Sequence, residues 1–236
     1  MTAEAENGPG RIAIVAARDE GDRIGATLAA LREASPGIGL WVADDASSDD
    51  TRDVALAGGA TVIGRNRPHG KGGNVTAAAT AALEGLDPEV TVLLCDGDLA
   101  ATAGRLIPLL EAVEAGECDL AIAAFERKVG GGLGLAKGYA RNAIEKLCGL
   151  ETTAPISGQR AMRARVLTDL LPLAPRYGME IGMTVDAVRG GYRVGEIELD
   201  LAHRATGRSL RGFIHRGRQL RDFVAIYRDR RRAGRG

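Results

Sequence analysis

Short apolar runs alternate with segments of helical spacing through the first two thirds of the chain. The runs consist mainly of Ala, Val, Leu and Ile, which is typical of buried strands. We expect strands at Arg11–Ala17, Gly39–Ala43, Thr61–Gly64, Val90–Cys95 and Leu120–Ala124. We expect helices at Asp22–Glu33, Asp49–Leu56, Asn74–Leu83, Leu106–Ala115 and Lys137–Leu147. This alternation predicts an α/β fold with a Rossmann-like, largely parallel central sheet and helices on both faces.

Three connections carry signals of their own. Ser47 and Ser48 precede a predicted helix and are expected to cap its N-terminus. Gly70–Gly73 predicts a glycine-rich turn before the Ala-rich helix, and Gly130–Gly134 predicts a flexible loop.

The rest of the chain is less regular. We expect helices at Val166–Leu171 and Gly182–Arg189 and a strand at Val194–Leu199. From Ser209 to Arg232, apolar residues follow one helical stripe. The pattern predicts a flexible leader over residues 1–9, one domain over residues 10–208 and a basic amphipathic helix over residues 209–236.

Charge is distributed unevenly, although the formal net charge of the 236 residues is zero. Eleven arginines and only two acidic residues lie between Arg204 and Arg235. The apolar stripe could dock on a membrane or pack on its own domain. We favour packing on the domain, with the arginine face free for peripheral contact with an anionic membrane. No run approaches the roughly 20 apolar residues of a membrane span. Three cysteines without metal-ligand spacing fit a reducing compartment, so we expect a cytoplasmic protein, with the inner membrane face as its peripheral contact.

An acidic motif follows the predicted strand at Val90–Cys95. Asp96 and Asp98 flank Gly97 there. Ligands of open α/β sheets bind beyond the carboxyl ends of the strands, and Mg²⁺ is commonly held by one or two carboxylates together with phosphate oxygens. The motif therefore predicts a Mg²⁺ or Mn²⁺ ion that bridges a diphosphate, and an ordinary surface turn is the alternative.

Two further features suit a nucleotide. Asp44 and Asp45 follow the second strand and can accept hydrogen bonds from a base or a ribose, although a capped turn is the plain alternative. Lys71 offers a positive charge to an anion, and its plain alternative is an exposed loop lysine.

Taken together, these motifs resemble family 2 glycosyltransferases of the GT-A fold. Asp44–Thr51 is similar to the DDxSxDxT segment of that family, and Asp96–Asp98 is similar to its DxD motif. Ala16–Glu20 resembles the exit of the family's first strand, with Asp19 where the family usually has Asn. Gly70–Asn74 resembles its GKG turn, and the resemblance spans residues 11–208.

The resemblance implies a role for each matching residue. Asp44 or Asp45 would hold the base and ribose, Lys71 would approach the nucleotide, and Asp96 would face the ribose or donor sugar. Asp98 would be the main metal ligand and a catalytic residue. The residues expected to bind nucleotide or substrate are Ala16, Arg18, Glu20, Asp44, Asp45, Lys71, Asp96, Gly97, Arg160, Arg204 and Arg208.

The second half carries the expected acceptor side. Ser157–Arg160 is similar to the SGxR segment of polyprenyl-phosphate sugar synthases, although Ala154 stands where those enzymes carry an acid. Tyr177–Glu180 resembles their segment with a single Glu, and Ile181 occupies the place of the Asp that serves polymer-forming relatives as general base. A phosphate is already ionised at pH 7 and needs no strong base. The pattern therefore favours a phosphate-bearing acceptor, with Glu180 as the remaining candidate base or a structural carboxylate.

Three residues near the predicted last strand complete the expected site. By the resemblance, His203 would complete the metal shell, and a structural histidine is the alternative. Arg204 and Arg208 would bind the diphosphate or the acceptor phosphate.

We therefore predict a metal-dependent glycosyltransferase that moves a sugar from a nucleoside diphosphate to polyprenyl phosphate or a small phosphorylated metabolite. The family resemblance favours inversion at the anomeric carbon, and retention is left open because a related retaining group shares the fold. One alternative is a sugar-phosphate nucleotidylyltransferase, but Arg18 replaces the glycine that its AAGxGxRxG signature requires after Ala17. The other is a non-catalytic nucleotide-sugar-binding protein. No nucleic-acid partner is expected, and a homodimer is left open.

Overall fold

The computed structural model describes residues 10–125, 134–199 and 222–232. The strands are β1 (Arg11–Ala17), β2 (Gly39–Asp44), β3 (Thr61–Gly64), β4 (Thr91–Asp96), β5 (Leu120–Phe125), β6 (Arg160–Arg163) and β7 (Val194–Leu199). The helices are α1 (Ile24–Ala34), α2 (Thr51–Ala57), α3 (Lys71–Leu83), η1 (Gly97–Leu106), α4 (Ile107–Glu114), α5 (Gly134–Cys148), α6 (Ala164–Leu170), η2 (Arg176–Gly178) and α7 (Met179–Arg189). A further helix covers residues 222–232.

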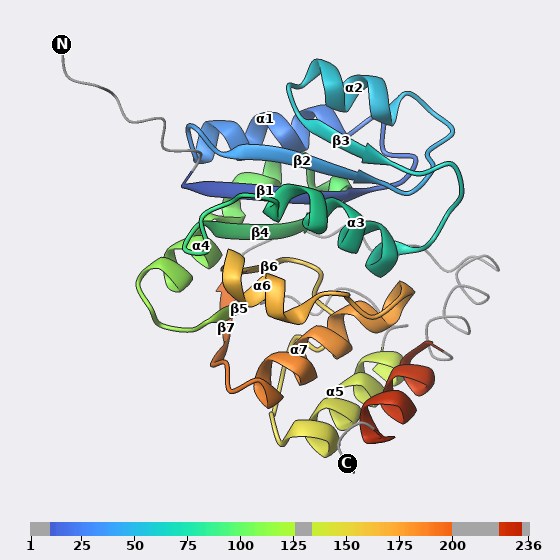
Figure 1. Cartoon of the computed structure of the whole chain (residues 1–236), viewed down its shortest axis with the longest axis vertical. Helices are drawn as coiled ribbons and strands as arrows, with labels where there is room; N and C mark the ends of the chain where they lie inside the picture. The colour runs from blue at the N-terminus through green and yellow to red at the C-terminus, as the bar shows by residue number, and fades with distance from the viewer. Residues whose placement is uncertain (1–9, 126–133, 200–221, 233–236) are drawn as a thin grey trace.

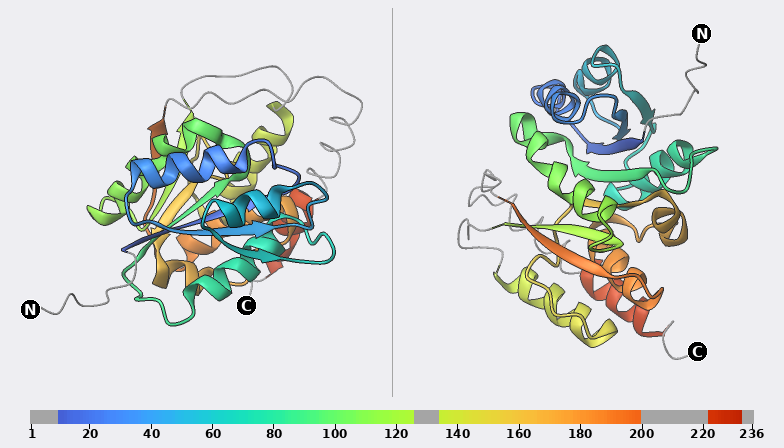
Figure 2. Two further views of the ribbon diagram at one scale, coloured as in Figure 1. Left: turned by 90° about the horizontal axis from the view of Figure 1, so that it is seen from above. Right: turned by 90° about the vertical axis from the view of Figure 1, so that its left-hand side faces the viewer.

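The strands form one sheet of seven, in the order β3-β2-β1-β4-β6-β5-β7. β6 runs antiparallel to β4 and β5, and every other pair of neighbouring strands is parallel. Helices cover both faces of the sheet (Figures 1 and 2). The predicted α/β fold is confirmed, and the six strands expected from the apolar pattern agree with the structure to within one residue at each end.

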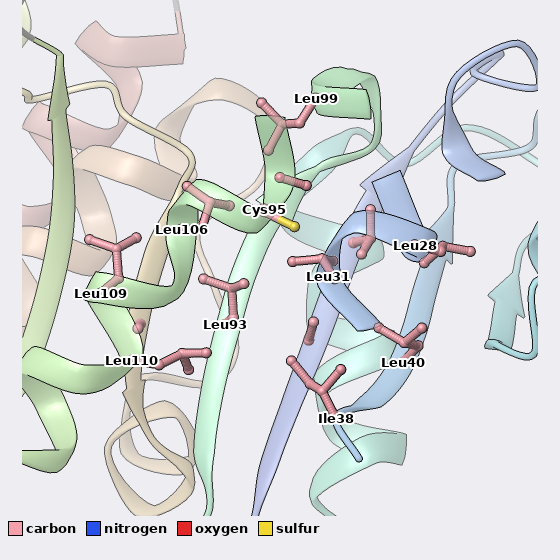
Figure 3. Packing of buried hydrophobic residues seen from close by; sticks show 14 of the residues in the cluster. Leu28, Leu31, Ile38, Leu40, Leu93, Cys95, Leu99, Leu106, Leu109 and Leu110 are labelled. Carbon is pink, nitrogen blue, oxygen red and sulfur yellow. The ribbon is translucent and has the colours of Figure 1, made fainter. Parts of the chain in front are cut away.

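Alternating residues of the central strands supply two apolar layers. Ala13 and Val15 of β1 pack with α1, η1 and α4 on one face, while Ile12 and Ile14 pack with α3, α6 and α7 on the other. Figure 3 shows the first layer, to which Leu28, Leu31, Leu93 and Leu106 all belong. Burial on both faces explains why these strands read as continuous apolar runs in the sequence.

The predicted caps and turn around α2 and α3 were wrong. Asp50 occupies the N-cap position of α2 without a side-chain cap, because Ser47 and Ser48 bond to Asp44 and Asp19 instead. The segment expected as a flexible turn forms the first turn of α3, which begins at Lys71.

Close packing explains the glycine within that first turn. A Cβ atom on Gly72 would lie 1.9 Å from the carbonyl oxygen of Ala174. This glycine therefore allows α3 to approach the segment before α7, rather than providing flexibility.

The pattern did not reveal β6, which lies between β4 and β5. Its sequence, Arg-Ala-Met-Arg, has a charged residue at each end and no apolar run. The strand nevertheless lies in the sheet interior, where Arg160 pairs with Leu94 and Ile122. Tertiary context thus overrides local propensity here.

The 222–232 helix packs on its own domain. Phe223 and Ile226 are buried in a cluster with residues of α5 and α7, including Ile144 and Ile181. Arg230 binds Asp186 of α7 through Nε and Nη2, at 2.7 and 2.6 Å. The structure therefore supports self-packing for this part of the predicted amphipathic segment. The predicted boundary between residues 208 and 209 lies outside the described residues. Of the predicted loop at Gly130–Gly134, only Gly134 is described.

Among the residues described, no helix has both the length and the apolar character needed to cross a membrane.

Replacing Phe223 with Ala should lower the free energy of unfolding by about 3 kcal/mol, because a fully buried aromatic side chain would leave a cavity against α5 and α7. Urea denaturation measures this change. Leu56, which is 49% exposed, provides the control, and Leu56→Ala should change stability by less than about 0.5 kcal/mol. Equal effects of the two substitutions would show that the helix does not pack on the domain.

Candidate active site

Three parallel strands end together at one edge of the sheet. The strand register places Ala17 beside Asp44 and Ala16 beside Asp96. The loops that follow β1, β2 and β4 therefore meet, as expected for parallel strands. This edge brings together the acidic motifs that were recognised in the sequence.

Asp44 and Asp45 are almost buried, at 5% and 6% exposure, and their own chain engages them. Asp44 accepts a hydrogen bond from the backbone amide of Ser47 at 3.1 Å. The two oxygens of Asp45 accept from the amides of His69 and Gly70, at 2.7 and 3.1 Å. Asp45 thus fixes the loop that leads into α3, a role that the sequence did not predict, and Arg18 lies at its exposed side, 3.9 Å away.

Asp19 tolerates the backbone conformation at the exit of β1. Its φ is +54°, in the left-handed region where Asn and Asp are enriched among non-glycine residues. Its carboxylate accepts from the amide of Ser48 at 2.8 Å, which ties the β1 loop to the β2 loop. An Asp residue therefore fits the local geometry at this position, where the family usually has Asn.

Lys71 lies between two carboxylates and is not an exposed loop residue. Its Nζ is 2.7 Å from Asp96 Oδ1 and 3.1 Å from Glu180 Oε1. Burial by itself would lower the pKa of this ammonium, but the charges and hydrogen bonds of Asp96 and Glu180 outweigh it and raise the pKa above its ordinary value. The ion pairs connect the N-terminus of α3 to β4 and α7.

The remaining oxygen of Asp96 is also held. Gln159 is 1% exposed, and its Nε2 donates to Asp96 Oδ2 at 3.0 Å. Gln159 is a site residue to which sequence reasoning assigned no role, although it lies within the SGxR-like segment. Only the fold brings its amide against a carboxylate 63 positions away.

Asp98 is exposed at the start of η1, directly beyond Asp96. Burial and the neighbouring Asp98 carboxylate are the main causes that raise the pKa of Glu20 above its ordinary value, while Arg23 opposes them. Negative charge is therefore concentrated between the β1 and β4 loops. A bound cation would relieve it.

Thr27 fixes the turn between Asp96 and Asp98. Its hydroxyl donates to the carbonyl of Gly97 and accepts from the amide of Ala100, both at 2.8 Å. A Cβ atom on Gly97 would lie 3.2 Å from the carbonyl oxygen of Ala16, tighter than most such contacts. Gly97 thus allows the β4 loop to lie closely against the end of β1.

The side chain of Arg160, which was expected to bind substrate, is fully buried. Its Nε donates to the carbonyl of Ser157 at 2.9 Å, and its Nη1 donates to Thr184 Oγ1 at 3.0 Å. Burial lowers the pKa of this guanidinium to about 10, against the charges of Glu180 and Glu196. Arg160 therefore belongs to the interior between β6 and α7.

Glu196 of β7 supplies a carboxylate near the position where the acid of the SGxR-like segment is missing. It accepts from the amides of Thr153 and Ala154, each at 3.0 Å. Burial acts to raise the pKa of Glu196, but hydrogen bonds from the side chains of Thr152 and Thr153, together with those from these two amides, lower it below its ordinary value.

His203, Arg204 and Arg208 lie outside the described residues. Within residues 10–125, 134–199 and 222–232, no group of three His, Cys, Asp or Glu side chains could hold a metal ion. Asp98 and its neighbours nevertheless fit a cation of the Mg²⁺ type, since such ions commonly use one or two carboxylates and take their other ligands from phosphate and water.

Comparison with known proteins agrees with this arrangement. The sequence model described as "Glycosyl transferase family 2" matches residues 12–171. An undecaprenyl-phosphate mannosyltransferase from Micrococcus luteus is 32% identical over 215 residues, which are 84% of this chain and 86% of that protein. A glucosyl-3-phosphoglycerate synthase from Mycolicibacterium paratuberculosis is 30% identical over 201 residues, which are 73% of this chain and 58% of that protein.

Solved structures extend the comparison. Glucosyl-3-phosphoglycerate synthase from Mycobacterium tuberculosis, in complex with phosphoglyceric acid, superimposes with a TM-score of 0.75 and 27% identity, covering 94% of this chain and 80% of that chain. The complex of that synthase with Mn²⁺, UDP and glucosyl-3-phosphoglycerate gives a TM-score of 0.74.

The fold and the site define a GT-A glycosyltransferase, and the chain belongs to glycosyltransferase family 2. The family resemblance seen in the sequence is confirmed, and neither alternative class is favoured.

Replacing Lys71 with Met should destabilise the protein by about 2 kcal/mol at pH 8, between the values typical of exposed and buried ion pairs. Because the pKa of Lys71 is raised above 10.5, its contribution is fully present at pH 8. Without the ammonium, Asp96 and Glu180 should take up protons more readily, so the deficit should shrink as pH falls toward 5. Thermal unfolding at both pH values measures this change, and a deficit independent of pH would contradict the ion-pair assignment.

Proposed function

We propose that this chain transfers a sugar from a nucleoside diphosphate to a phosphate-bearing acceptor, with the help of Mg²⁺ or Mn²⁺. The observation that carries the proposal is the contrast between the two carboxylates of the β4 loop. Both oxygens of Asp96 are engaged by Lys71 and Gln159, whereas Asp98 is exposed at the sheet edge. Asp98 is therefore the carboxylate that we assign to the metal.

The donor would lie across the ends of β1, β2 and β4. We assign Asp44 and Asp45, which follow β2 at this edge, to the side of the base and ribose, and Arg18 lies 3.9 Å from Asp45. When bound, the cation would neutralise negative charge on the diphosphate as it leaves. The complex of a structural relative with Mn²⁺ and UDP supports a metal and a nucleoside diphosphate as the ligands.

An ionised acceptor phosphate suits the state of Glu180. Its side chain is only 9% exposed, and it is paired with Lys71. A phosphate oxygen that attacks the anomeric carbon carries no proton, and the bond to the diphosphate breaks with its electron pair leaving on the nucleotide. Glu180 can then hold Lys71 in place without acting as a base. A glycerate hydroxyl acceptor would instead need a base, which is why we place polyprenyl phosphate first.

The 222–232 helix favours a lipid acceptor over a small metabolite. Its buried side packs on the domain, and Arg228, Arg231 and Arg232 are exposed. These arginines line a surface groove of about 530 Å³ with Tyr139 and Tyr227. Arginine and tyrosine are suited to the boundary between water and an anionic membrane. We propose peripheral binding to the membrane through this face.

Replacing Asp98 with Ala should abolish the metal-dependent part of nucleoside diphosphate binding and leave the fold intact, because the side chain is exposed. Isothermal titration calorimetry with UDP and GDP, with and without Mn²⁺, measures the binding, and circular dichroism checks the fold. A folded variant with unchanged metal-dependent affinity would remove Asp98 from the metal site.

Transfer assays on phosphorylated and unphosphorylated acceptors test the proposed activity. We expect sugar transfer to polyprenyl phosphate in vesicles, and none to neutral sugar hydroxyls. Flotation with anionic and neutral vesicles at low salt tests the membrane surface, with the triple change of Arg228, Arg231 and Arg232 to Gln as the comparison. Transfer only to a neutral hydroxyl would contradict the acceptor class. Transfer to phosphoglycerate without vesicle binding would select the small metabolite.

A further inference from the structure

We infer that Gln159 is a positioning residue that holds Asp96 away from the metal. Of the two carboxylates of the β4 loop, Asp98 would then bind the metal while Asp96 pairs with Lys71. This inference rests on the proposed function and goes beyond it, since it explains why two neighbouring carboxylates would take different roles. It also gives the SGxR-like segment a function other than acceptor binding.

The geometry around Asp96 carries the inference. Lys71 Nζ lies 2.7 Å from Oδ1, and Gln159 Nε2 donates to Oδ2 at 3.0 Å. The two groups come from α3 and from the residue before β6, so they approach the carboxylate from different elements. A carboxylate held at both oxygens has little freedom to turn toward a cation. Loss of the Gln159 hydrogen bond would remove one of the contacts that fix its orientation.

Gly158 provides an independent observation. A Cβ atom at this position would lie 2.3 Å from Lys71 Nζ and 3.0 Å from Asp96 Oδ2. The backbone before Gln159 thus passes directly against the Lys71–Asp96 pair, and a side chain at this position would displace the end of Lys71. Two consecutive residues of the segment are therefore fitted to the same ion pair, one by its hydrogen bond and one by its lack of a side chain.

Because charged groups surround Asp96, the orientation of its carboxylate determines which partners Lys71 keeps. Among the described residues, Lys71 pairs with Asp96, Glu180 shares that ammonium, and the charge of Asp96 acts on Glu20 and Cys95, as does that of Asp98. One ammonium faces several carboxylates, so a second carboxylate turned toward the cation would leave Lys71 with Glu180 alone. Gln159 satisfies Asp96 with a neutral donor and adds no charge to this cluster.

Two substitutions at the same position test the inference. Gln159→Leu removes the donor and should weaken metal-dependent UDP binding by about tenfold at every pH between 5.5 and 8, the size expected for a lost hydrogen bond to a charged group. Gln159→Glu places a carboxylate against Asp96. At pH 8 it should bind more weakly than the Leu variant, and at pH 5.5 it should recover most of the wild-type affinity, because the two carboxylates can then share a proton.

Thermal unfolding of the metal-free and nucleotide-free protein gives a second readout. The melting temperature of Gln159→Glu should lie well below that of the wild type at pH 8 and approach it at pH 5.5. The sign follows from linkage, because a carboxyl group whose pKa is raised in the folded state destabilises that state once the pH exceeds the raised pKa. The Leu variant, which adds no titratable group, should show a deficit that changes much less between these two pH values.

The outcomes separate this inference from the proposed function. Recovery of the Glu variant at low pH, with none for the Leu variant, supports the positioning role. Equal impairment of both variants at every pH, or a Glu variant that does not fold at any pH, overturns it and makes Gln159 a packing residue. A wild-type chain that binds no nucleotide with metal contradicts the proposed function, while the unfolding profiles still decide the role of Gln159.

Discussion

A single ammonium group links the elements that form the carboxyl edge of the sheet. Parallel strands deliver their following loops to one side, and in this chain those loops carry mostly acidic residues. Lys71, at the first position of α3, lies between Asp96 of β4 and Glu180 of α7. It joins the donor half of the sheet to the segment where the acceptor is expected. Without this cation, Asp96 and Glu180 would both lose the ammonium that they share.

Other features of the site support the position of that ammonium. Asp45 holds the amides of His69 and Gly70 and so sets where α3 begins. Gly72 lets the helix approach the chain before α7, and Gly158 leaves space for the ammonium itself. The glycines of the sequence motifs are therefore explained by close approach of the backbone. Within this frame, Asp98 remains exposed and is the carboxylate best placed for a metal.

The sequence predicted much of the fold and less of the site. Strands such as β1 and β4 are buried on both faces, so their apolar runs identified them directly. The strand β6 was missed because Arg160 and Arg163 interrupt any such run, although the sheet buries Arg160 completely. Residue type and spacing located Asp96, Asp98 and Lys71. They could not show that Lys71 is paired twice, that Gln159 reaches Asp96 or that Arg160 faces the interior, since these contacts join segments distant in sequence.

The most direct test of this account is the ionisation of Lys71 in the unliganded protein. The sequence contains four lysines, so side-chain NMR resonances can be assigned with single Lys→Arg variants of the other three. In a titration from pH 8 upward, the resonance of Lys71 should remain that of a charged ammonium after the other lysines have lost their protons, because Asp96 and Glu180 raise its pKa. A Lys71 that titrates together with the others, or before them, would contradict the ion pairs that organise the site.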